Sequence, residues 1–65
     1  MLIKIAGDET EIPDGFSIKQ LMRLTGAADN IVVVLNGNII GAENWAGTML
    51  NANDEVELIQ FVAGG

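Results

Sequence analysis

Alternating apolar and polar positions open the chain and predict a β-hairpin. In residues 1–6 the only charged residue, Lys4, marks the solvent face of a strand. The side chains expected to point together toward the core are Met1, Ile3 and Ile5. Residues 7–10 are typical of a turn, and residues 11–13 are expected to form the return strand, whose proline suits an edge or a strand end.

The next apolar pattern predicts a helix over residues 18–25. Ser17 is a suitable N-cap, Gln20 completes an S-x-x-Q capping box, and Gly26 supplies the stop. The basic residues of the segment share one side of this helix. The apolar residues expected on the opposite side, facing the core, are Ile18, Leu21, Met22 and Leu24.

A second hairpin is predicted in the middle of the chain. Residues 31–35 form a β-branched run without helical period, and Asn36-Gly37 is the dipeptide that favours a type I′ turn into residues 38–40. Residues 41–50 lack clear periodicity and are expected to wrap the core as a loop with a short helical turn. Trp45 in this loop is interpreted as a core residue.

The end of the chain predicts the last and longest strand. Residues 51–54 are typical of a turn, and residues 55–62 alternate in character as a strand does. Together the elements predict a single α+β domain over residues 1–65 with the β-grasp arrangement, in which one main helix packs on one face of a mixed sheet. Residues 63–65 are expected to form a flexible C-terminal Gly-Gly tail.

The outer face of this last strand turns apolar toward the C-terminus. Glu55 and Glu57 must face water, and the period of two places Ile59 and Phe61 on the same face. An apolar outer face next to the chain end suggests a docking surface for a partner that takes up the C-terminus. The alternative is that neighbouring strands or Trp45 cover these side chains.

Composition narrows the chemistry. The chain has no cysteine and no histidine, which removes disulfides, thiolate nucleophiles, imidazole bases and the usual zinc ligands. Nine acidic residues against three basic ones give a net charge of −6, which argues against a nucleic-acid partner and favours a partner with a basic surface. No apolar run approaches the roughly 20 residues that cross a bilayer, and no signal segment opens the chain. We therefore expect a cytoplasmic protein without a membrane partner.

The reactive groups that remain are carboxylates, hydroxyls and the chain ends. No base is available to activate Ser17, so its capping role is preferred and no catalytic residue is expected. The scattered glycines form no phosphate-binding pattern, and the acidic turns do not follow calcium-loop spacing, so no metal site is expected. Gly64 and Gly65 directly follow a strand and form an arm without side chains that can enter a narrow tunnel. The alternative is a frayed end.

These features coincide with a known family pattern. They comprise the run Val32-Val33-Val34-Leu35-Asn36-Gly37, Trp45 downstream of it, the turn leading into Asp54-Glu55-Val56-Glu57, and the terminal Gly64-Gly65. On these residues the whole chain resembles the thiamine-biosynthesis sulfur carrier (ThiS) family of the ubiquitin-like superfamily.

The resemblance implies a carrier protein and not an enzyme. In that family an E1-like adenylating enzyme activates the terminal carboxylate with ATP, and a persulfide sulfur replaces the adenylate to leave a thiocarboxylate. Gly65 would then carry the sulfur, Gly64 would pass the narrow part of the partner's site, and Ile59, Phe61 and Ala63 would contact the partner. The chain itself would bind no cofactor. The implied partners are the adenylating enzyme, a sulfur donor of the cysteine desulfurase or rhodanese type, and thiazole synthase.

Three alternatives stay open at this point. The ending Val62-Ala63-Gly64-Gly65 is also similar to the small subunit of molybdopterin synthase, although the proline pair usual before that tail is missing here. A ubiquitin-like modifier would instead join Gly65 to lysines of target proteins. A β-grasp interaction module would need neither glycine.

Overall fold

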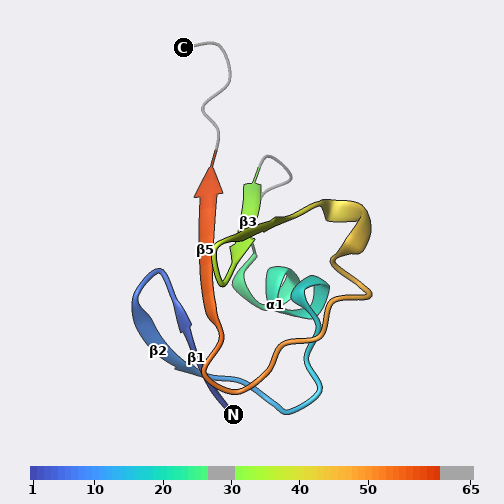
Figure 1. Ribbon diagram of the computed structural model, residues 1–65. Helices are drawn as coiled ribbons and strands as arrows, with labels where there is room; N and C mark the ends of the chain where they lie inside the picture. The colour runs from blue at the N-terminus through green and yellow to red at the C-terminus, as the bar shows by residue number, and fades with distance from the viewer. Residues whose placement is uncertain (27–30, 61–65) are drawn as a thin grey trace.

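The computed structural model describes residues 1–26 and 31–60, which form one mixed sheet with a helix packed on one face (Figure 1). In chain order the elements are β1 (Leu2–Ile5), β2 (Asp8–Glu11), α1 (Ile18–Thr25), β3 (Ile31–Leu35), β4 (Asn38–Ile40), the 3-10 helix η1 (Ala42–Asn44) and β5 (Glu55–Gln60). The sheet order is β2-β1-β5-β3-β4, with β1 and β5 parallel and the other neighbours antiparallel. The expected α+β architecture is confirmed.

The first hairpin turns earlier than the sequence pattern predicts. The turn lies at Ala6-Gly7, where both residues have positive φ (51° and 85°), and β2 occupies residues that were expected to form the turn. A two-residue turn with both φ values positive matches the right-handed twist of the flanking strands. An alanine seldom adopts this conformation, so the sequence held no signal for it. The predicted return strand at residues 11–13 is therefore wrong except at Glu11.

Helix α1 follows the predicted limits and capping. The Ser17 hydroxyl accepts from the Gln20 amide (3.2 Å), while the Gln20 side chain accepts from the Ser17 amide (2.8 Å). Gly26 ends the helix in the left-handed conformation. The prediction for Leu24 is wrong, because this side chain is 61% exposed at the last turn, beyond the edge of the core. Within the described residues, no helix has the length and apolar character that crossing a membrane requires.

The second hairpin and the loop after it form as predicted. Asn36 and Gly37 both have positive φ (49° and 86°), and the turn places Leu35 opposite Asn38. The loop contains the short helix η1, and Trp45 at its end packs against the core. The Trp45 indole Nε1 donates to the carbonyl of Ile40 (3.0 Å), which anchors the loop over the end of β4.

The core lies between α1 and the sheet. Its buried apolar side chains are Ile3, Ile12, Ile18, Leu21, Met22, Val33, Leu50 and Val56. The predicted inward orientation of Met1 and Ile5 is confirmed, since both are half-buried against this cluster. Because side chains alternate along a strand, the residues between the buried ones lie on the sheet face opposite α1. We call this second face the open face.

A buried carboxylate ties the second hairpin to the start of β5. Asp54, 9% exposed, accepts from the Asn36 side-chain amide (3.0 Å) and from the Asn51 backbone amide (2.7 Å). The Asn36 side-chain oxygen in turn accepts from the Glu55 amide (2.9 Å). Both side-chain oxygens of Asp54, and the side-chain oxygen and nitrogen of Asn36, thus take part in hydrogen bonds. This network fixes the position at which β5 enters the sheet, and so it sets the course of the strand up to its C-terminal end.

Candidate functional site

The open face carries an apolar patch close to the C-terminal end of β5. Ile59 is 45% exposed and faces away from the core, as the strand period predicts. Its neighbour across the ladder is Val32, and Val34 pairs with Ile39, which is 73% exposed. These four residues, from three adjacent strands, form what we call the open-face patch. Its place in the sheet leaves Ile59 accessible to a partner.

The sequence reasoning found only one of the four residues of this patch. The signal for the others was available, because alternation around the buried Val33 places Val32 and Val34 on the face opposite the core. Ile39 follows from its position opposite Val34 in the hairpin. The alternation could not show that these residues are neighbours, because β3 and β5 are separated by nineteen residues of chain and meet only in the folded sheet.

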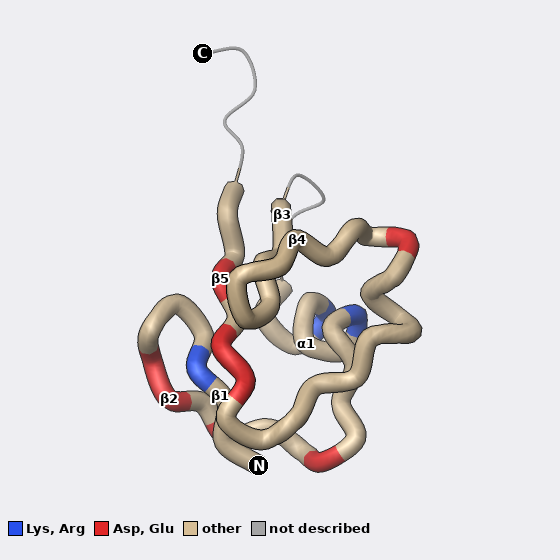
Figure 2. Tube along the Cα trace, viewed as in Figure 1, with Lys and Arg blue, Asp and Glu red and all other residues tan. Residues whose placement is uncertain are grey.

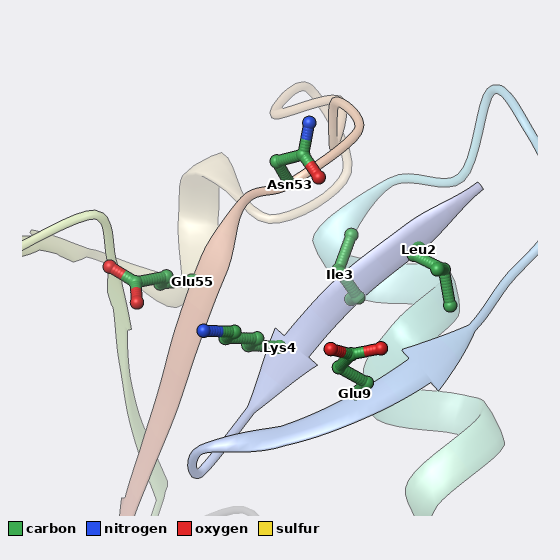
Figure 3. A pocket seen from close by; sticks show the side chains of 6 residues that line it. All are labelled: Leu2, Ile3, Lys4, Glu9, Asn53 and Glu55. Carbon is green, nitrogen blue, oxygen red and sulfur yellow. The ribbon is translucent and has the colours of Figure 1, made fainter.

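The other end of the open face is charged. Lys4 on β1 lies between Glu9 on β2 and Glu55 on β5 in the strand register, and these three line a depression of about 230 Å³ with Leu2 and Asn53 (Figure 3). The Lys4 side chain extends toward Glu55, while Glu9 projects from β2. Along β2 and the first half of β5, acidic residues outnumber basic ones (Figure 2). The open face therefore changes from acidic to apolar along β5.

The N-terminus lies at the opposite end of the sheet from the end of β5 (Figure 1). The Met1 ammonium donates to the carbonyl of Ile12 (2.7 Å) and lies 3.2 Å from Asp14 Oδ1 and 3.6 Å from Glu11 Oε1. The hydrogen bond that the ammonium donates to Asp14, with the charges of Glu11 and Asp14, raises the pKa of this ammonium above its ordinary 8.0, against a smaller opposing effect of burial. The ammonium thus holds the start of the chain against residues 11–14, at the end of the first hairpin.

The predicted reactive end lies outside the described residues. Gln60 is the last residue of β5, so Phe61, Ala63, Gly64 and Gly65 follow it directly along the chain. Their predicted roles, in partner contact and in carrying the reactive carboxylate, stay predictions. The described structure shows where this segment begins, at the end of the central strand and beside the open-face patch.

The described part of the chain contains no group of three or more acidic side chains positioned to hold a metal ion. Ser17 is only 5% exposed, and its hydroxyl accepts a hydrogen bond in the capping box. The acidic side chain most removed from solvent, Asp54, has both oxygens occupied by hydrogen bonds. These groups are accounted for by the architecture, which directs attention to the segment after β5.

Comparisons with known proteins agree on one family. The ThiS family model matches residues 2–65. Among solved structures, the crystal structure of the thiamine biosynthesis protein ThiS from Geobacter metallireducens is similar, with a TM-score of 0.88, 23% identity and full coverage of both chains. The solution structure of a thiamine biosynthesis protein from the same organism has a TM-score of 0.80 and 23% identity, covering all of this chain and 88% of the other.

No match is found among curated protein sequences. The two structural likenesses, at this level of identity, establish the fold, and the expected β-grasp arrangement is confirmed. The family model extends from the first strand to the terminal diglycine, so it includes the strand, the patch and the segment that follows them. On that match, the chain belongs to the ThiS family.

Proposed function

We propose that this chain is a sulfur carrier of thiamine biosynthesis, with the carboxylate of Gly65 as its reactive group. The observation that carries the proposal is the family match over residues 2–65, which reaches the terminal Gly64-Gly65. The similar Geobacter metallireducens structures are described as thiamine biosynthesis proteins, which supports the assignment of the pathway. The chain acts as a carrier, and the chemistry belongs to its partners.

The chemistry explains why a partner enzyme is needed. A carboxylate is a poor electrophile, and the described residues offer it no activating group. An adenylating enzyme joins the Gly65 carboxylate to the AMP portion of ATP and releases pyrophosphate, which creates a good leaving group. The outer sulfur of a persulfide on the donor then displaces AMP to form an acyl disulfide. A second thiol of the partner cleaves its S–S bond, which leaves the thiocarboxylate on Gly65 and a disulfide on the partner. Gly64 lets the backbone pass a constriction that any Cβ would obstruct.

The open face supplies the recognition surface in this proposal. A partner that takes up Gly65 must approach the end of β5, where the open-face patch begins. Ile59, with Phe61 and Ala63 farther along the chain, would contact apolar side chains of the adenylating enzyme. The net charge of −6 favours a basic rim on that enzyme. The sulfur donor and thiazole synthase are the other proposed partners, and the cytoplasm is the proposed location.

The proposal is tested by intact mass after incubation with ATP, a candidate adenylating enzyme and a sulfur donor. We expect replacement of one oxygen by sulfur, mapped to the C-terminal peptide. Deletion of Gly65 and Gly64→Trp should each abolish this change without altering thermal stability. Leu24→Trp adds the same side chain at an exposed helical position and should load normally. Normal loading of both tail variants would refute the tail mechanism.

Docking through the patch is tested separately. Ile59→Ser should weaken binding to the adenylating enzyme by about fivefold or more, because a well-packed apolar side chain at an interface centre contributes more than about 1 kcal/mol. Leu24→Ser removes a comparably exposed apolar side chain from α1 and serves as the control. Equal affinities of the two variants would remove Ile59 from the interface. Conjugates to target lysines that survive reductant would instead identify a modifier.

A further inference from the structure

The central strand has one edge that is only partly paired. On one side, β5 pairs with β3 over five positions, from Val56 to Gln60. On the other side, β1 pairs with β5 only at Glu55 and Val56. The chain then turns away at Ala6-Gly7 into β2, and the second half of β5 rises beyond the first hairpin (Figure 1). An interior strand thus presents a short free edge at its C-terminal end.

The hydrogen-bond pattern identifies the backbone groups on this edge. The Asn36 amide donates to the Glu55 carbonyl (2.8 Å), so Glu55, and by alternation Glu57 and Ile59, direct their backbone groups to β3. The intervening residues direct theirs to the β1 side, as the bond from the Ala6 amide to the Val56 carbonyl (2.9 Å) shows. Beyond that bond, the described chain supplies no backbone partner for Leu58 or Gln60 on this side.

Free edges elsewhere in this sheet are accounted for differently. β2 and β4 are true edge strands of four and three residues, and β2 is acidic, which discourages pairing with another chain. The free edge of β5 differs from these, because it belongs to the central strand and because the chain leads from it into the segment that carries the diglycine. A single extended segment lying here would extend the sheet next to the proposed reactive end.

We propose that the enzyme that takes up the C-terminus adds an extended segment to this free edge of β5. The inference rests on the proposed function, because it assumes that a partner holds the tail. Strand addition gives affinity through backbone hydrogen bonds and gives specificity through alternate side chains. Here it also explains how a partner could fix the direction of the tail, since the added segment would pair with the strand from which the tail continues.

The side chains of β5 define the chemistry of the added segment. On the open face it would lie beside Glu57 and Ile59, which share that face. A complementary segment therefore carries a lysine or arginine beside Glu57 and an apolar side chain beside Ile59, two positions apart. Its apolar side chain would be continuous with the open-face patch, and its basic side chain would meet the acidic half of that face.

Amide hydrogen exchange of the full chain tests this inference directly. In the free protein, the Leu58 and Gln60 amides should exchange faster than those of Glu57 and Ile59, which face β3. On addition of a purified adenylating enzyme of the family, exchange at Leu58 and Gln60 should slow by about tenfold or more. Unchanged exchange at both amides in a formed complex would overturn strand addition.

A pair of substitutions at one position provides a second test. Gln60→Pro removes the edge amide and blocks pairing, while a proline at a free strand edge leaves the ladder with β3 intact. Gln60→Ala removes the side chain and keeps the amide, so it is the matched control. We expect Gln60→Pro to weaken binding of the adenylating enzyme by about tenfold and Gln60→Ala to leave it unchanged. Equal affinities at similar thermal midpoints would overturn the inference.

Failure of this inference is distinguishable from failure of the proposed function. If the wild-type chain is loaded with sulfur but Leu58 and Gln60 stay unprotected, the carrier function stands and strand addition is overturned. If no family partner loads Gly65, the proposed function fails whatever the exchange data show. Protection of Leu58 and Gln60 that rises with the concentration of this chain alone would assign the edge to a second copy, and would overturn the proposed occupant.

Discussion

Substitution of the buried Asp54 tests how much the hydrogen-bond network at the start of β5 contributes to stability. Its two oxygens accept from Asn36 Nδ2 and from the Asn51 amide, and Asn36 Oδ1 accepts from Glu55. In Asp54→Asn the new side chain has one oxygen and one amide group. In either orientation, the new amide group faces a donor, which is the Asn36 side-chain amide or the Asn51 backbone amide. The Asn36 side chain cannot turn to offer its oxygen instead, because that oxygen accepts from the Glu55 amide.

The expected cost follows from that count of partners. Asp54→Asn takes the acceptor away from one of the two original donors and should lower the free energy of unfolding by about 1–2 kcal/mol. Asp54→Ala leaves two donors without acceptors and should lower it by about 2–4 kcal/mol. At about 0.05–0.15 kcal/mol per residue, a domain of this length has a total of only about 3–10 kcal/mol. The alanine variant should therefore lose roughly 15–30 °C in thermal midpoint.

Urea unfolding followed by the fluorescence of Trp45, which packs against the core, measures both variants. Asp8→Asn removes the same charge from an exposed strand position and controls for the reduced net charge. We expect the order wild type, Asp54→Asn, Asp54→Ala, with Asp8→Asn close to wild type. If Asp54→Asn were no less stable than Asp8→Asn, the hydrogen-bond reasoning would be wrong and the carboxylate would be dispensable to the fold.

Three further perturbations have defined outcomes. Because the pKa of the Met1 ammonium is raised in the folded protein, its stabilising effect is complete below about pH 8 and is lost as the pH rises through the folded-state pKa. The urea midpoint should therefore fall between pH 7 and pH 10, and it should fall less in Asp14→Asn. Ser17→Ala should cost about 1 kcal/mol in urea unfolding, with Gln20→Ala costing less, because Ser17 satisfies a helix-end amide. Leu24→Gln should leave the free energy of unfolding within about 0.5 kcal/mol of the wild-type value. A larger loss would contradict the exposure of this side chain.

The local structure of several segments can be read directly from the sequence. The capping box at Ser17, the stop at Gly26 and the turn at Asn36-Gly37 are each decided by a few adjacent residues, so their chemistry is legible along the chain. The same holds for the outward position of Ile59, which follows from the period of the strand. The family resemblance likewise rested on short motifs, and the family is confirmed.

Other features depend on contacts between segments that are distant in the sequence, and these became visible in the folded sheet. The turn at Ala6 is imposed by the pairing of β1 with β2, against the preference of alanine, and Leu24 is exposed because the core ends before the last turn of α1. The joining of Asn36 to Asp54, the gathering of Val32 and Ile39 around Ile59, and the free edge of β5 all follow from the strand order. Strand order is set by the packing of the whole chain, and no local pattern encodes it.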